Sequence, residues 1–139
     1  MESVDMKKLE TAIIYLQRIS DGNNPINNLP ADEDSVLNNP NVIRCMFFVK
    51  EILEEVKRKS KFIIDELKNA DGVKSVTGLG LMLGIETEKD ASEVIKICQE
   101  NGVLPIKAKN KVRLLPPLNI TDEELIKAIQ VIKKAVKVG

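Results

Sequence analysis

The stretch VTGLGLMLGIE, residues 76–86, decides the fold of the second half of this chain. Leu79 to Glu86 is a short apolar run, which predicts a buried strand, and Val73 to Val76 predicts a shorter strand before it. The glycines at positions 78, 80 and 84 have two interpretations. They shape a bend and a bulge in a packed sheet, which we favour, or they let the backbone pass beside a bound ligand.

Downstream of this stretch the pattern alternates between helix and strand. Ala91, Val94, Ile95 and Cys98 recur at helical spacing, and Asn101-Gly102 provides a helix end. Two short strands follow, Val103 to Ala108 and Lys111 to Leu115, and Pro105 should force an edge position or an irregularity in the first. The final helix begins at a capping box formed by Thr121 and Glu124.

Two helices are expected upstream. The first runs from Asp5 to Asp21-Gly22, and residues 22–39 are rich in Asn, Pro and Asp, which indicates turns. Asn39-Pro40 then starts one long helix of about residues 40–69, because an apolar seam repeats at intervals of four and three. The seam residues are Val42, Met46, Val49, Leu53, Val56, Ser60, Ile63 and Leu67. Further apolar residues, including Phe47 and Phe48, predict that this helix is covered on more than one side, by the first helix, the downstream sheet or another copy of the chain.

These elements predict a mixed α/β (α+β) fold. An N-terminal helical hairpin runs through the long helix into a small α/β domain, whose three- to four-stranded, largely antiparallel sheet is flanked by helices. We expect a helical module over residues 1–56 and the small domain over residues 57–139. The 139 residues suffice for a small domain with a helical appendage and not for a large two-domain enzyme.

Composition limits the possible partners. Lys plus Arg and Asp plus Glu both number 21, so no net charge attracts nucleic acid or an anionic membrane, and the basic run at residues 57–61 is typical of a solvated helix face. Cys45 and Cys98 are expected to be buried free thiols, and a chain without histidine offers no zinc or haem site. No signal peptide or membrane span is expected, so the predicted location is the cytoplasm.

Several linked phrases in order resemble a known family: DGVKSVTGLGLMLGIE, then a helix, ENGV, KNKVRLLPPLNIT and a terminal helix beginning DEEL. They are similar to the small C-terminal domain of class III, fold-type I aminotransferases, which use pyridoxal phosphate, and to the acetylornithine aminotransferase branch in particular. The resemblance covers about residues 57–139. It implies amino transfer between N-acetylornithine and 2-oxoglutarate, in arginine biosynthesis, for the whole enzyme.

Arg113 is the one functional residue that the resemblance carries to this chain. The arginine of VRLLPPL implies a binding site for the substrate α-carboxylate, and a guanidinium can hold a carboxylate with two parallel hydrogen bonds. The alternative is a solvent-exposed or ion-paired arginine at the end of a strand. Lys107 stands where relatives usually have a hydroxyl residue, and together with Pro105 it departs from the family pattern.

The groups that bind the cofactor are expected to be missing. Amino transfer requires a lysine that forms a Schiff base with pyridoxal phosphate, an acid for the pyridinium nitrogen and donors for the phosphate. In the family these lie in the large domain, and here the helical segment of residues 1–56 takes that position. We therefore predict no catalytic residue, no metal site and no cofactor bound by this chain alone.

Three functions remain open. The first is a non-catalytic interaction or assembly unit, or a remnant, that forms a homo-oligomer through its long helix. The second is one half of a split aminotransferase, completed by a large-domain chain. The third is a module that binds an amino acid or a related metabolite through Arg113.

Overall fold

The computed structural model describes residues 4–139, and these divide into two compact units. Unit 1 ends at Arg58 and unit 2 begins at Lys59. The boundary falls within helix α2, Pro40–Leu67, which is therefore shared by both units. Its start is fixed locally, because the Asn39 side chain accepts a hydrogen bond from the Asn41 amide at 2.9 Å. The predicted long helix is confirmed, with its end two residues earlier than expected.

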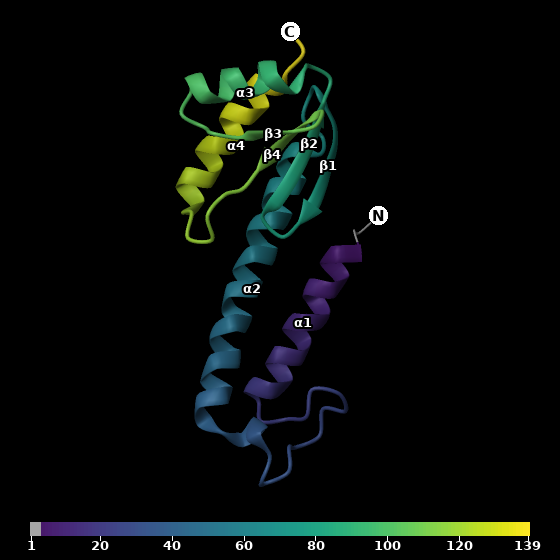
Figure 1. Ribbon diagram of the computed structural model, residues 1–139, viewed down its shortest axis with the longest axis vertical. Coiled ribbons are helices and arrows are strands. Elements are labelled where there is room, and N and C mark those ends of the chain that lie inside the picture. Colours follow the sequence, from purple (N-terminus) through teal and green to yellow (C-terminus); the bar gives the residue numbers. More distant parts are fainter. Residues whose placement is uncertain (1–3) are drawn as a thin grey trace. The chain divides into compact units, whose positions relative to one another are not determined.

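Unit 1 is a helical hairpin. Helix α1, Val4–Ser20, is followed by a turn-rich segment with one short 3-10 helix, Val36–Asn38, and then by the first part of α2 (Figure 1). Polar contacts tie the two helices together. The Lys50 ammonium donates to the Gln17 side chain at 2.7 Å, and Lys57 pairs with Glu10 at 2.7 Å. The two pairs show that α1 and α2 run antiparallel.

Unit 2 is built on a four-stranded antiparallel sheet in the order β1-β2-β4-β3. The strands are β1 (Val73–Leu79), β2 (Met82–Thr87), β3 (Ile106–Ala108) and β4 (Lys111–Leu114). A two-residue turn at Gly80-Leu81 joins β1 to β2, and Lys109-Asn110 joins β3 to β4. Figure 1 shows one face of this sheet without a helix over it.

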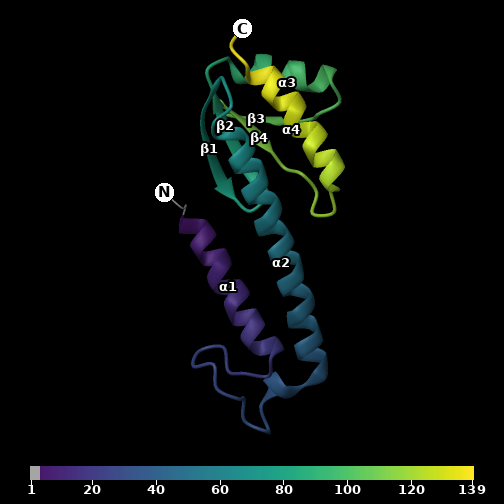
Figure 2. The same cartoon turned by 180° about the vertical axis from the view of Figure 1, so that it is seen from behind.

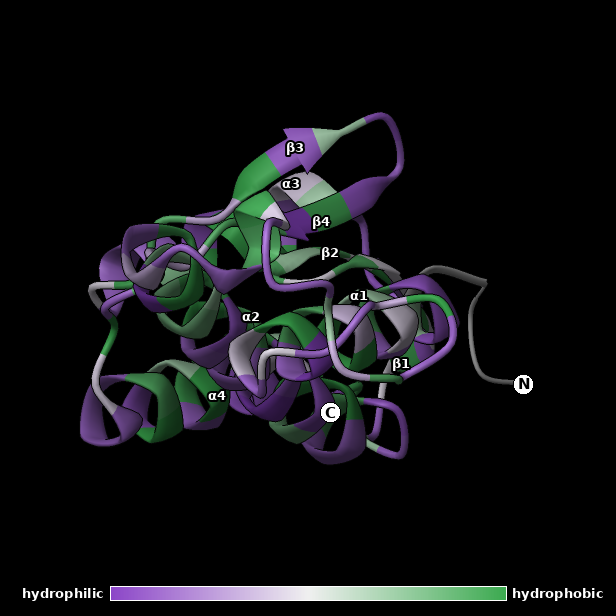
Figure 3. Cartoon of the chain, turned by 90° about the horizontal axis from the view of Figure 1, so that it is seen from below, coloured by the Kyte–Doolittle hydropathy of each residue, from purple (hydrophilic) through white to green (hydrophobic). Residues whose placement is uncertain are grey.

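Helices cover the opposite face of the sheet, as Figure 2 shows from behind. They are the end of α2, α3 (Ala91–Glu100) and α4 (Asp122–Val136). Figure 3 shows hydrophilic and hydrophobic residues alternating along β4 and around α4, the pattern of elements with one buried side. The core is almost wholly aliphatic, as predicted. Its most enclosed residues include Ile63, Leu67, Leu83, Ile85, Val94, Val112, Ile132 and Val136.

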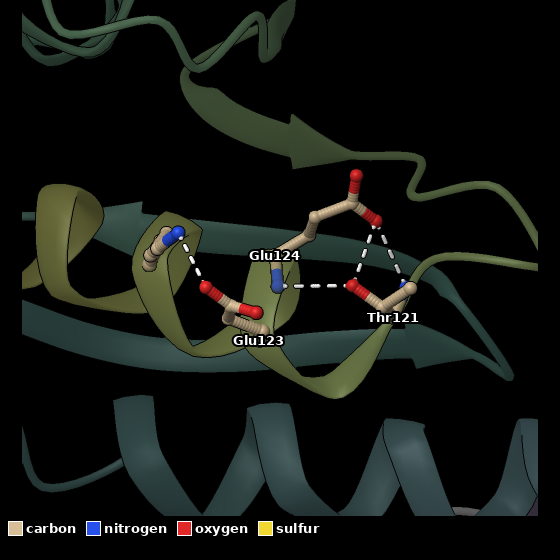
Figure 4. A network of polar contacts seen from close by, with 4 residues as sticks. Thr121, Glu123 and Glu124 are labelled. Carbon is tan, nitrogen blue, oxygen red and sulfur yellow. Dashed lines mark hydrogen bonds and ion pairs between the residues drawn. The ribbon is translucent and has the colours of Figure 1, made fainter.

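Helix α4 begins at the predicted capping box (Figure 4). The Thr121 hydroxyl accepts from the Glu124 amide at 3.2 Å, and the Glu124 carboxylate accepts from the Thr121 amide at 3.0 Å. The hydrogen bonds from Thr121 lower the pKa of Glu124 below its usual value. Asp90 caps α3 in a similar way, since its carboxylate accepts from the Ser92 amide at 2.8 Å. Both helix starts are thus encoded by neighbouring residues.

Several strand limits differ from the sequence expectation. The apolar run from Leu79 to Glu86 is divided, because Gly80-Leu81 forms a hairpin turn and β1 extends to Leu79. Gly78 has a φ of +148°, and a Cβ there would lie 2.1 Å from the Met82 carbonyl oxygen. The strand expected from Val103 begins only at Ile106, after Pro105. It lies at the sheet edge, as Pro105 predicted.

One burial prediction for α2 is wrong. Cys45 is exposed, whereas Cys98 is buried, and burial raises the pKa of the Cys98 thiol. The physical reason is that unit 1 supplies only one further helix to cover the first part of α2. Phe47 and Phe48 are 46% and 63% exposed, so no described part of the chain covers their side chains fully.

The search for membrane spans covered the described residues and gave no candidate, because none of their helices combines sufficient length with sufficient apolar character.

Candidate functional site

Arg113 lies on the bare face of the sheet. Its neighbours in β4, Val112 and Leu114, are buried, and alternation along a strand therefore directs the Arg113 side chain to the opposite face. In the register of the sheet Arg113 is paired with Gly84 of β2 on one side and with Ile106 of β3 on the other. The guanidinium thus projects from an inner strand and not from the sheet edge.

A hollow of about 380 Å³ surrounds Arg113 on this face. Its lining comes from all four strands and the β3–β4 turn, and includes Thr77, Met82, Gly84, Ala108, Lys109, Asn110, Lys111 and Arg113. Because Gly84 has no side chain, it leaves space at the bottom of this hollow. A Cβ at this position would lie 3.4 Å from the Lys111 side chain and 3.8 Å from Thr77. Gly84 therefore contributes space beside a cation, whereas Gly78 serves the backbone geometry of the hairpin.

The cations and acids of this face differ in how they are held. Lys111 donates to the Thr77 hydroxyl at 3.2 Å, and Ser75 donates to the Glu86 carboxylate at 3.2 Å. Within residues 4–139 the Arg113 guanidinium has no hydrogen-bond or ion-pair partner. An exposed guanidinium with its donors available can receive a carboxylate in the two-bond geometry.

Sequence reasoning identified Arg113 and missed its surroundings. Lys111 was not singled out, although its spacing of two from Arg113 in a strand places both on one face. The sequence therefore contained a signal for Lys111. It contained none for the nearness of Thr77 and Gly84 to Arg113, which depends on the pairing of β2 with β1 and β4. Lys107 lies apart from this site and donates to the Ser92 hydroxyl at 2.6 Å.

The residues described here do not fit a pyridoxal phosphate site. Such a site requires an available lysine amine beside an acid and phosphate donors. The two buried lysines are both engaged: Lys50 donates to Gln17, and Lys59 donates to the Leu118 carbonyl at 2.9 Å. The hollow around Arg113 contains no carboxylate in its lining. No group of three or more Cys, Asp or Glu residues in the described chain could hold a metal ion.

The sequence pattern of the family described as Aminotransferase class-III matches residues 40–136. This chain belongs to the class-III aminotransferase family. The match includes all four strands and Arg113, as well as α2 from its first residue, and stops short of α1 and the turn-rich segment that follows it.

Within the class-III aminotransferases, the curated relatives similar to this chain include acetylornithine aminotransferases. Acetylornithine aminotransferase of Haemophilus ducreyi is 42% identical over 82 residues, which is 58% of this chain and 21% of the relative. The Bacillus cereus enzyme of the same name is 37% identical over 89 residues, covering 60% of this chain and 23% of the relative. The chain thus spans about a fifth to a quarter of the length of these relatives.

The fold agrees with solved aminotransferase structures. N-acetylornithine aminotransferase from Stenotrophomonas maltophilia matches with a TM-score of 0.58 and 30% identity, over 68% of this chain and 29% of that one. Ornithine aminotransferase from Toxoplasma gondii, described with partial occupancy of PLP at its active site, matches with a TM-score of 0.56 and 26% identity, over 68% of this chain and 25% of that one. The predicted resemblance and the mixed α/β fold are both confirmed.

Proposed function

We propose that this chain provides the carboxylate-binding surface of an acetylornithine-type aminotransferase and depends on a cofactor-bearing domain outside this sequence. The observation that carries the proposal is Arg113: an exposed guanidinium without a partner in the described chain, set beside Gly84 in a hollow of the sheet. The family and its acetylornithine aminotransferase relatives support the assignment to amino transfer.

Arg113 would bind and orient the substrate. A guanidinium holds a carboxylate through two parallel charge-assisted hydrogen bonds, which fixes its position and also its plane. Lys111, anchored on Thr77, would add positive charge beside the same hollow. The chemistry supplied by pyridoxal phosphate, storage of electrons during amino transfer, would come with the other domain. Alone, this chain would not transfer amino groups.

Exposed apolar residues in unit 1 favour a second function, that of an assembly unit. Phe47 and Phe48 on α2 and Ile14 on α1 are between 46% and 63% exposed. Large apolar side chains left exposed on a small unit provide a surface that a partner can cover. The two functions are compatible, because the exposed residues lie in unit 1 and Arg113 lies in unit 2.

The test is complementation of an acetylornithine aminotransferase from which its own C-terminal small domain has been removed. Adding the full chain, with pyridoxal phosphate, should restore amino transfer from N-acetylornithine to 2-oxoglutarate. Arg113→Ala should lower the restored kcat/KM by about tenfold to a hundredfold, the range expected for loss of a hydrogen bond to a charged group. Arg113→Lys should recover only part of this, because an ammonium cannot form the two-bond geometry.

Lys109→Asn is the matched control. It removes a charge from the lining of the same hollow, in a turn where asparagine tolerates the backbone φ of 57°. Activity should change little. Restoration that is equally strong with Arg113→Ala would contradict the role of Arg113, and amino transfer by the purified chain alone would contradict the dependence on another domain.

A further inference from the structure

The side chain of Lys111 crosses the bare face of the sheet from β4 to β1. Its ammonium donates to the Thr77 hydroxyl at 3.2 Å, two strands away from its own backbone. On the way it passes over Gly84 of β2, because a Cβ at that position would lie 3.4 Å from Lys111 Cδ and 3.8 Å from Thr77 Oγ1. A longer side chain on residue 84 would occupy this passage. The absence of a side chain on Gly84 therefore lets Lys111 reach Thr77.

The ammonium of Lys111 is held in the row of the sheet that contains Arg113. Thr77 is paired with Gly84, and Gly84 is paired with Arg113. Neighbouring strands lie about 4.8 Å apart, so the backbones of Thr77 and Arg113 are about 10 Å apart, with Gly84 between them. The ammonium on Thr77 and the guanidinium of Arg113 thus border the hollow of about 380 Å³ on opposite sides.

No acid of the described chain compensates these two cations. Among the described residues that line the hollow, Lys109, Lys111 and Arg113 are cations and none is an acid. The acid paired with Lys111 across the strands is Glu86, but the Glu86 carboxylate accepts from Ser75 at 3.2 Å, and the ammonium is directed elsewhere. Like charges on one face of a sheet repel one another. An anion from outside the chain would remove this repulsion.

The donors of the two cations exceed what one carboxylate can accept. A guanidinium has five N–H donors, and the guanidinium of Arg113 has no partner within residues 4–139. An ammonium has three donors, of which Lys111 uses one on Thr77. About seven donors therefore remain, against about four acceptor positions on a carboxylate. A second anionic group on the same ligand can use the remainder.

We propose that Lys111 is a second anion-binding residue of this hollow. Arg113 holds one anionic group of a ligand over Gly84 and Lys111 holds another, so the site prefers small ligands with two negative charges to ligands with one. This role rests on the proposed function, in which Arg113 binds a carboxylate, and adds a charge selectivity that Arg113 alone does not provide. Thr77 is a positioning residue, because its hydroxyl fixes the ammonium beside the space over Gly84.

The test compares the binding of succinate and propionate to the full chain at constant ionic strength and neutral pH. Propionate is succinate with one carboxylate removed, so the pair isolates the second charge. NMR signals of the β2 and β4 amides and of the Arg113 side chain follow the titration. The wild-type chain should bind succinate with a Kd on the order of millimolar and about tenfold more tightly than propionate, the lower end of the effect of one further hydrogen bond between charged groups.

Two variants separate the charge of Lys111 from its placement. Lys111→Met keeps an unbranched side chain and removes the charge, so it should weaken succinate binding about tenfold and leave propionate binding nearly unchanged. Thr77→Val keeps the shape of residue 77 and the charge of Lys111 but removes the hydroxyl that holds the ammonium. It should reduce the preference for succinate about threefold, because the ammonium then loses its fixed position.

Lys96→Gln is the matched control. It removes one positive charge from an exposed position of α3, on the opposite face of the sheet, and should leave the preference for succinate as in wild type. Equal binding of succinate and propionate by the wild-type chain, or a preference that survives Lys111→Met, would overturn the role of Lys111 and leave that of Arg113 in place. Propionate binding that Arg113→Ala does not weaken would instead contradict the proposed function.

Discussion

At the scale of single residues, the sheet depends on positions where only glycine fits. The two-residue turn between β1 and β2 brings Gly78 so close to the Met82 carbonyl that no room remains for a side chain. Gly102 also has a positive φ, of 82°, but a Cβ there would meet nothing within 4 Å. Comparing the two glycines distinguishes the effect of steric contact from the effect of backbone strain, because both have a positive φ and only Gly78 is crowded.

Gly78→Ala should lower the free energy of unfolding by about 3 kcal/mol or more, because a Cβ 2.1 Å from a backbone oxygen forces the hairpin apart. Gly102→Ala should lower it by about 1–2 kcal/mol, the strain of the left-handed region alone. Urea denaturation of both variants followed by circular dichroism measures the difference. Equal losses for the two would mean that β1 and β2 are not joined by this tight turn.

At the scale of elements, the helices of unit 2 are defined by local polar contacts at their starts. Helix α4 has both halves of a capping box and three acidic residues in its first turn, which interact favourably with the positive end of the helix dipole. Helix α3 has Asp90 as its cap, and the hydrogen bonds from Ser92 lower the pKa of Asp90. Each of these helix starts is therefore stabilised when its acidic side chain, Glu124 or Asp90, is ionised.

Thr121→Ala should lower the free energy of unfolding by about 0.5–2 kcal/mol, because the Glu124 amide loses its acceptor. Thr121→Ser, which keeps the hydroxyl, should lie much closer to wild type. Thermal denaturation at neutral pH gives both values. No difference between the alanine and serine variants would show that the hydroxyl contributes little to this helix start.

The same cap predicts a pH dependence. The pKa of Glu124 is lower in the folded chain than in the unfolded one, so the unfolded state binds protons first as the pH falls. The contribution of Glu124 to stability is therefore complete above the usual glutamate pKa of about 4.3 and is lost as the pH drops through the folded value. An NMR titration should find Glu124 titrating below the usual range in wild type and nearer to it in Thr121→Ala. The variant keeps the amide hydrogen bond to the carboxylate and loses only the hydroxyl one, so an unchanged titration would contradict the contribution assigned to the hydroxyl.

At the scale of the whole molecule, the two units differ in how their stability is supplied. Unit 2 has an aliphatic core between its sheet and its helices, with Ile63, Leu67 and Ile85 fully buried. Unit 1 has polar contacts between its helices, such as Lys50 with Gln17 and Lys57 with Glu10, but no buried apolar residue among those described. Its local stability must be lower unless another surface covers the hairpin.

Hydrogen–deuterium exchange at low protein concentration should therefore find the amides of α1 exchanging faster than those of β2 and α4. Equal protection of both units at low concentration would show that unit 1 is stabilised within the single chain.

Local chemistry let the sequence alone determine the order and type of the elements. The Thr121–Glu124 box, the Asn39-Pro40 helix start and the strand predicted at Lys111 to Leu115 involve residues within a few positions of one another, and the structure confirms each of them, with that strand ending at Leu114. Only the tertiary structure decided which apolar faces are covered and which side chains meet. Cys45 and Cys98 occupy similar helical patterns, yet only Cys98 lies against a sheet. Gly84 reaches Arg113 through the register of two strands that a helix separates in the chain, and such a pairing leaves no trace in a local pattern.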